Sequence, residues 1–122
     1  VYGSSEVFLS VLSADQFPSI EKTNKENAFS LLQKDFKDLI NKTIFSAAYD
    51  DARPILKGVL FEIIDNKITT VALDGYRMAI CSKPIKADFN TSLIVPARCL
   101  SEINKILEDN DDTIELYLQK NY

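Results

Sequence analysis

The stretch from residue 58 to 82 constrains the fold most, because it reads as three strands joined by very short links. The predicted strands are rich in apolar and β-branched residues and cover 58–64, 67–73 and 76–82. Their links, Asp65-Asn66 and Asp74-Gly75, are residue pairs typical of tight turns. Strands joined by hairpin-length links pair antiparallel, and their apolar face needs a cover from another layer.

A strand followed by an amphipathic helix is predicted on each side of this meander. The first copy has a strand at 28–32 and a helix from about 33 to 45, whose apolar stripe is Phe36, Leu39, Ile40, Thr43 and Ile44. The second has a strand at 91–95 and a helix opened by Pro96, with a stripe of Cys99, Leu100, Ile103, Ile106 and Leu107. A last strand is predicted at 113–118. This order indicates an α+β fold with two helices on one face of a curved antiparallel sheet, and it disfavours a parallel doubly wound fold.

The two ends of the chain suggest a fragment. Residues 1–14 alternate like a short strand, and residues 15–27 hold Pro18 and many polar residues, as linkers do. The chain starts without Met, so we expect an excised piece of a longer protein. The second strand-helix copy is followed by one strand where the first is followed by three, so we expect the domain to be incomplete at its C-terminus.

Composition excludes several function classes. The 14 basic and 18 acidic residues give a net charge of −4, so any contact with nucleic acid must be local and weak. There is no histidine, which excludes Ser-His and Cys-His nucleophile pairs and imidazole metal sites. Glycine occurs at three scattered positions, so no phosphate-binding loop is present and no cofactor is expected. The sequence has no apolar run long enough to span a membrane and no signal-peptide pattern, and we expect a cytoplasmic protein.

Several segments of the meander resemble the middle domain of the bacterial sliding clamp family, the β subunit of DNA polymerase III. They are Arg53-Pro54-Ile55-Leu56, residues 58–62, and the run Asp74-Gly75-Tyr76-Arg77-Met78-Ala79. The resemblance lies in their order and spacing and extends over residues 1–122. It implies that residues 1–14 are the last strand of a preceding clamp domain, 15–27 an interdomain linker and 28–122 a truncated middle domain.

The resemblance also implies a function. Members of this family form a head-to-tail ring homodimer that encircles duplex DNA without reading its sequence and tethers the replicative polymerase, which confers processivity. They do no chemistry themselves, although they are subunits of a DNA-directed DNA polymerase (a nucleotidyltransferase). The implied partners are duplex DNA, the clamp loader, polymerases, and other replication and repair proteins that carry a short peptide motif. We expect that the fragment alone does not close a ring.

Two sets of site residues follow from the resemblance, and none of them is catalytic or binds a metal. The family places DNA-contacting residues at Arg53 and Arg98, and the helix faces would add Lys34, Lys37, Lys42 and Lys105. The family's pocket for peptides ending in Leu or Phe would take from this chain Leu56, Leu73, Gly75, Tyr76, Arg77 and Met78. Leu73 often matches a Thr, Tyr76 a His and Met78 a Leu in that family.

Two other interpretations remain open at this point. A small enzyme using Asp74 and Arg77 would need a deep polar pocket and a carboxyl group with a strongly shifted pKa. A protein-interaction module without a DNA role predicts that the lysines and arginine of the two helices do not gather on one face. Taken alone, Asp74 to Arg77 is a hairpin turn, and the helix lysines are solvated side chains.

Overall fold

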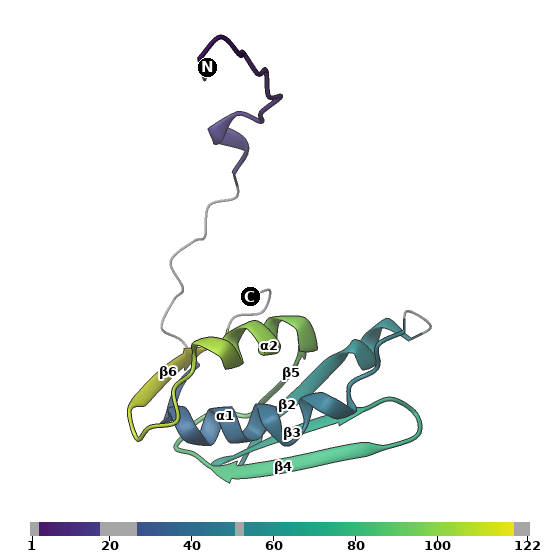
Figure 1. Ribbon diagram of the computed structural model, residues 1–122. Coiled ribbons are helices and arrows are strands. Elements are labelled where there is room, and N and C mark those ends of the chain that lie inside the picture. The colour runs from purple at the N-terminus through teal and green to yellow at the C-terminus, as the bar shows by residue number, and fades with distance from the viewer. Residues whose placement is uncertain (1–2, 18–26, 51–52, 119–122) are drawn as a thin grey trace.

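The computed structural model describes residues 3–17, 27–50 and 53–118, and its elements follow the predicted order (Figure 1). The helices and strands are β1 (Ala28–Leu32), α1 (Gln33–Asn41), β2 (Gly58–Ile64), β3 (Lys67–Leu73), β4 (Met78–Pro84), β5 (Thr91–Pro96), α2 (Ala97–Ile106) and β6 (Thr113–Tyr117). Short 3-10 turns are η1 (Ala14–Gln16), η2 (Ile44–Ser46) and η3 (Pro54–Lys57).

The strands form two antiparallel sheets, one of four strands in the order β4-β3-β2-β5 and one that pairs β1 with β6. Both helices cover the same face of the four-stranded sheet (Figure 1). The predicted α+β fold with helices on one face is therefore confirmed. The single sheet of the prediction is divided in two, with an isolated bridge between Ser30 and Lys86 joining the parts.

The first predicted turn has the expected geometry. Asp65 and Asn66 both have positive φ, at 50° and 60°, so the two-residue link matches the twist of the flanking strands. Ile64 pairs directly with Lys67 across it. The Asn66 side chain also accepts a hydrogen bond from the Ala87 amide at 3.0 Å, which fixes the later β4–β5 connection to the same turn.

The second link is longer than predicted. Strand β4 begins at Met78, which pairs with Leu73, so four residues lie between β3 and β4. The reason is local: Oδ1 of Asp74 accepts hydrogen bonds from the amides of Tyr76 and Arg77, at 2.9 and 3.0 Å. Those two amides are therefore used inside the turn and do not extend the strand ladder.

The core lies between α1 and the inward residues of β2 and β3. Alternate residues of the two strands are buried, as the two-residue period of a strand requires: Val59, Phe61 and Ile63 on β2, and Ile68, Thr70 and Ala72 on β3. From α1, Phe36, Leu39 and Ile40 pack against them, with the rings of Phe36 and Phe61 6.1 Å apart. Burial of each large apolar side chain contributes roughly 1.5–3 kcal/mol.

Helix α1 ends earlier than predicted, at Asn41 instead of residue 45. Thr43 leaves the helical region, at φ −128° and ψ −38°, and its hydroxyl donates to the Leu39 carbonyl at 2.6 Å. A threonine hydroxyl that bonds the preceding turn competes with the next backbone hydrogen bond. The apolar stripe is still formed, because Thr43 is fully buried and Ile44 packs at its edge.

The stripe predicted for α2 is only partly buried. Leu100 is 1% exposed, whereas Cys99 is exposed, Ile103 is 37% exposed and Ile106 is 80% exposed. The two sheets diverge beneath this helix, and an apolar groove of about 230 Å³ lies there, with Ile103 on its wall. Among the described residues of this stripe, only Leu100, which points at the four-stranded sheet, is therefore fully buried.

The strand predicted within residues 1–14 does not form in the described part of that stretch. Residues 6–13 have no helix or strand, and η1 occupies residues 14–16. Apolar side chains such as Phe8 and Leu12 are exposed, because no described strand pairs with this segment. Most of the linker predicted at 15–27 lies outside the described residues.

Candidate functional site

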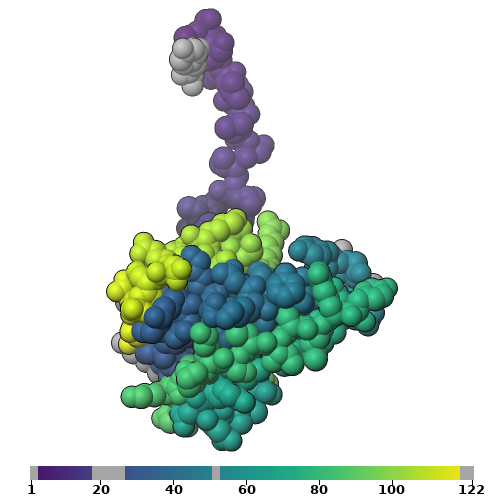
Figure 2. Space-filling view, turned by 60° about the horizontal axis from the view of Figure 1, so that its bottom comes forward, coloured from purple at the N-terminus to yellow at the C-terminus, as the bar shows by residue number. Residues whose placement is uncertain are grey.

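The outward faces of α1 and α2 form the first candidate surface. The helices run antiparallel and side by side: near the C-terminal end of α2, the Asn104 side chain donates to Oδ1 of Asn41 at 2.8 Å, and the Glu108 amide just beyond α2 donates to Oε1 of Gln33 at the start of α1 at 3.0 Å. Figure 2 shows the α1 surface (blue) running between the β6 region (yellow) and the four-stranded sheet (green). Side chains on the outer sides of both helices therefore share one side of the domain.

Three of the five helix cations predicted to face DNA are paired with carboxylates. Lys34 pairs with Asp111, Lys42 with Asp38 at 2.7 Å, and Lys105 with Glu102 at 2.8 Å. The hydrogen bond and charge of Asp111 raise the pKa of Lys34, and the hydrogen bond from Lys105 lowers the pKa of Glu102. These pairs neutralise much of the positive charge that the two helices carry.

Lys37 and Arg98 differ from these three lysines. The ammonium of Lys37 is partly buried and donates to the Leu107 carbonyl at 2.9 Å, so it caps the C-terminal end of α2. Arg98 lies in the first turn of α2 and has no ion pair within the described ranges. Lys37 and Arg98 are therefore the two helix cations without an ion pair in the described ranges, and of the two only Arg98 is exposed.

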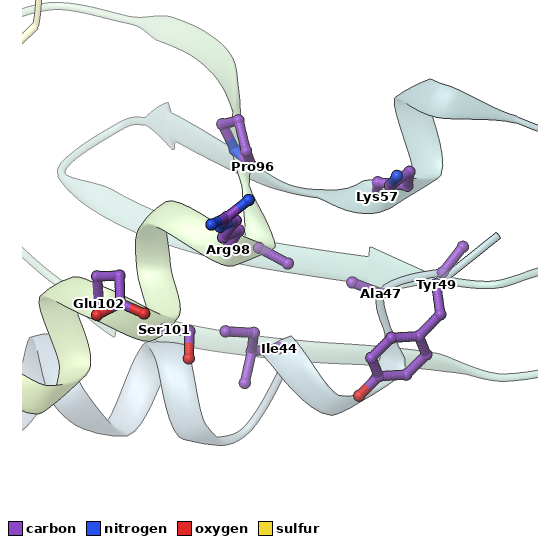
Figure 3. A pocket seen from close by; sticks show the side chains of 10 residues that line it. Ile44, Ala47, Tyr49, Lys57, Pro96, Arg98, Ser101 and Glu102 are labelled. Atoms are coloured by element: carbon purple, nitrogen blue, oxygen red, sulfur yellow. The ribbon is translucent and has the colours of Figure 1, made fainter. Parts of the chain in front are cut away.

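Arg98 also lines a cavity of about 370 Å³ at the end of the helix pair. Figure 3 shows Arg98, Ser101 and Glu102 on one side and Tyr49 and Lys57 on the other. Ile44, Ala47, Ala48, Pro96 and Ala97 complete the lining. The cavity combines cationic, aromatic and apolar side chains beside the N-terminus of α2, where an anion is favoured.

The turn between β3 and β4 is the second candidate site, and Asp74 organises it. Besides accepting the two amides described above, its other carboxylate oxygen accepts the Nε–H of Arg77 at 2.9 Å. The backbone bonds to Tyr76 and Arg77 hold the pKa of Asp74 below its usual value. A carboxylate used in this way closes a turn, so Asp74 and Arg77 have a structural role here. This role argues against their use as an acid-base pair.

Two residues from the segment before β2 contact this turn. Arg77 lies over the ring of Phe45, with its Cζ atom 5.8 Å from the ring centroid. The guanidinium of Arg53 lies against Gly75, where an added Cβ would be 3.2 Å from Nη2. Arg53, predicted to face DNA, is therefore beside the predicted peptide pocket. The sequence analysis did not single out Phe45. Its position directly after the apolar stripe of α1, but outside it, was a signal that this aromatic ring does not belong to the core.

The predicted pocket residues lie at one end of the four-stranded sheet. Leu73 and Met78 are direct cross-strand partners on its helix-free face, and Tyr76 at the tip of the turn is 99% exposed. Leu56 is half-buried in η3, directly before β2. The structure thus brings together an apolar pair, an exposed aromatic ring and a fixed guanidinium.

The apolar surface continues beyond the predicted residues. Along the next row of the same face, Ile80 pairs with Val71, Val71 with Leu60, and Leu60 with Ile94. Ile80 and Ile94 at the ends of the row are 57% and 45% exposed. The sequence analysis did not single out this row, because which residues share a row depends on the register of all four strands.

No group of acidic residues or cysteines in the described ranges is arranged to hold a metal ion. The acidic loop after α2 instead caps α1: the carbonyls of Asp112 and Asn110 accept the amides of Gln33 and Lys34, at 2.8 and 3.2 Å. Among the helices of the described residues, none is long and apolar enough to cross a bilayer.

Comparison with known proteins identifies the family of this domain. The family described as DNA polymerase III beta subunit, central domain, matches residues 30–122. The beta sliding clamp of Escherichia coli K12 is 38% identical over 120 residues, which cover 98% of this chain and 33% of the relative. The beta sliding clamp of Halalkalibacterium halodurans is 32% identical over 123 residues, again with 98% of this chain covered and 32% of the relative.

Solved structures agree with the sequence comparison. A putative DNA polymerase III beta subunit from Eubacterium rectale superimposes with a TM-score of 0.83 and 34% identity, covering 90% of this chain and 30% of that one. The beta subunit from Pseudomonas aeruginosa superimposes with a TM-score of 0.80 and 32% identity, covering 97% of this chain and 33% of that one. The chain spans about a third of the length of the curated relatives it matches. The family match covers most of the chain, and the fold agrees with it. The chain therefore belongs to the DNA polymerase III beta subunit family and corresponds to its central domain.

Proposed function

We propose that this chain is part of a DNA sliding clamp, a non-catalytic ring that encircles duplex DNA and tethers the replicative polymerase to it. The observation that carries the proposal is the antiparallel pair α1 and α2, packed on one face of the sheet (Figure 1), with exposed cations such as Lys34 and Arg98 on both helices. In this proposal the shared outer face lines the hole of the ring.

The charge pattern suits that role. Phosphate contacts carry no sequence information, and their strength grows with the number of phosphates that lysines and arginines neutralise. Ion pairs such as Lys42–Asp38 and Lys105–Glu102 keep the attraction weak, so a ring held by topology can slide. Arg98 supplies the principal contact, because it is not neutralised by an ion pair in the described ranges.

We also propose the wider organisation of the protein. Residues 1–14 belong to a preceding clamp domain, 15–27 to the linker, and 28–122 to the middle domain. The exposed apolar side chains of residues 7–12 support this division, since a segment with such side chains needs a partner layer to cover them. The full-length protein forms the ring as a homodimer, and tethering raises the local concentration of polymerase at the template.

The turn and the strand ends beside it form this domain's share of a pocket for partner peptides. Leu73 and Met78 provide the apolar floor, Tyr76 an exposed ring, and Arg77 hydrogen-bond donors. Polymerases, the clamp loader and repair proteins with a peptide ending in Leu or Phe are the proposed partners. Leu56 and Gly75 are the other residues of this domain that we assign to the pocket.

The DNA role is tested by charge reversal in the full-length protein. Arg98→Glu places a negative charge at the proposed DNA surface, so we expect faster loss of the loaded clamp from circular DNA and shorter products in primer extension. Lys67→Glu is the matched control, because Lys67 lies on β3 beside inward-facing Ile68 and is exposed away from the helices. Equal processivity of the wild type and the Arg98 variant contradicts the DNA-facing assignment.

The peptide role is tested by calorimetric titration of a synthetic peptide ending in Phe into the full-length protein. We expect Tyr76→Ala and Arg77→Ala each to weaken binding, because both side chains border the proposed pocket. The Lys67→Glu variant again serves as the control. Unchanged affinity in both alanine variants removes the turn from the binding site.

A further inference from the structure

Phe45 is a large aromatic residue that is 50% exposed, at a place where the structure offers it no pocket in the core. It lies in η2, between Ile44 at the edge of the core and Ser46, which is buried. Its recorded ring contact is the guanidinium of Arg77, 5.8 Å from the ring centroid. A core-packing role does not account for a ring left in this position.

The guanidinium of Arg77 is held on two sides. Asp74 accepts its Nε–H at 2.9 Å, and its Cζ atom lies over the Phe45 ring. The Arg77 side chain is nevertheless 54% exposed, and in the described residues its two terminal amino groups have no hydrogen-bond acceptor. A planar guanidinium fixed in this way presents its remaining donors in one direction and loses little conformational entropy when a ligand binds.

We propose that Phe45 is a positioning residue of the partner-peptide site and sets the direction in which Arg77 offers its terminal N–H groups to a carbonyl or carboxylate oxygen of the peptide. This inference rests on the proposed peptide-binding function of the turn. It assigns to Phe45 an effect through Arg77, without requiring contact between Phe45 and the peptide. In this inference, the segment between α1 and β2 helps to orient a side chain of the β3–β4 link.

The physical basis is the attraction between a cation and the negative face of an aromatic ring, which is modest at exposed sites. Its loss should free Arg77 to sample other rotamers, and peptide affinity should fall by about two- to fivefold. Leu retains most of the apolar volume of Phe but has no ring face. Tyr retains the ring, so it should restore the effect.

The test is a double-mutant cycle on the full-length protein, titrated with the same synthetic peptide ending in Phe. The variants are Phe45→Leu, Phe45→Tyr, Arg77→Ala and the double variant Phe45→Leu/Arg77→Ala. We expect Phe45→Leu to weaken binding about two- to fivefold, Phe45→Tyr to bind like the wild type, and the Leu change to have no further effect once Arg77 is absent. In NMR spectra of the free protein, the Nε–H signal of Arg77 should lose its ring-current shift in Phe45→Leu and keep it in Phe45→Tyr.

Each outcome decides a separate question. If the wild-type protein does not bind the peptide, the proposed peptide-binding function fails. If Arg77→Ala weakens binding and Phe45→Leu does not, the function stands and the positioning role of Phe45 is wrong. Additive effects in the double variant also overturn the inference, because Phe45 would then act independently of Arg77.

Discussion

The Nζ atom of Lys83 on β4 lies 2.8 Å from Oδ1 of Asp35 on α1, and this ion pair joins the edge strand of the four-stranded sheet to the helix above it. Lys83 also lies 3.1 Å from Asp38, one turn further along α1. Both carboxylates raise the pKa of Lys83, Asp35 more than Asp38. Strand β4, which begins at the peptide turn, is thereby tied to α1 near its other end.

Removing this link should destabilise the domain modestly. Lys83→Met keeps the apolar stem but leaves Asp35 and Asp38 without their shared cation, so we expect the free energy of unfolding to fall by about 0.5–1 kcal/mol. Urea denaturation at neutral pH measures the change. Lys86→Met is the control, because Lys86 is exposed on the following connection and forms no ion pair with the residues that the structure describes. An equal loss in both variants would mean that the Lys83 pair contributes nothing specific.

Acidification should remove part of the stability through Asp38. Hydrogen bonds from Lys42 and then Lys83 lower the pKa of Asp38 below its ordinary value of 3.8. A carboxyl group whose pKa is lower in the folded state stabilises that state above its unfolded pKa, and the contribution is lost as pH falls through the folded pKa. We therefore expect the wild type to lose stability below about pH 4 and Asp38→Asn to lose less over the same range, as followed by urea denaturation at stepped pH. Parallel pH profiles would contradict this.

Asp74 should control the peptide turn through its acceptor oxygens more than through its charge. Asp74→Ala leaves the amides of Tyr76 and Arg77 without their acceptor, so the turn should open more often. Asp74→Asn keeps a carbonyl oxygen that can accept both amides, so the turn should persist. Hydrogen exchange of the two amides should accelerate in the alanine variant and change little in the asparagine variant. Fast exchange in both would show that the carboxylate charge is essential.

Lys37 should contribute more to the stability of the helix pair than to DNA binding. Its ammonium donates to the Leu107 carbonyl at the end of α2, so Lys37→Met should lower the free energy of unfolding by about 1 kcal/mol. Lys42→Met is the matched control, since Lys42 directly follows the same helix and lies in an exposed ion pair of small value. If Lys37→Met shortens the lifetime of the loaded clamp without affecting stability, Lys37 is a DNA contact instead.

Local sequence signals predicted most elements and missed some of their limits. The stripe Phe36, Leu39, Ile40 and the turn Asp65-Asn66 were readable because each depends on neighbours within a few residues. The stop of α1 and the long β3–β4 link were not, because the side chains of Thr43 and Asp74 bond the backbone and end the regular pattern. The exposure of Ile106 depends on which elements pack against α2, which helical periodicity does not contain.

By itself the sequence determined the order of the elements, the inward face of each strand and the likeness to the sliding clamp family, since periodicity and turn chemistry are properties of adjacent residues. Only the tertiary structure decided that Lys34, Lys42 and Lys105 are paired with carboxylates, that Arg53 lies against Gly75, and that Phe45 lies under Arg77. Long side chains meet partners far away in the chain, and those meetings depend on strand register and helix packing. The charge and shape of both candidate surfaces are therefore products of the assembled fold.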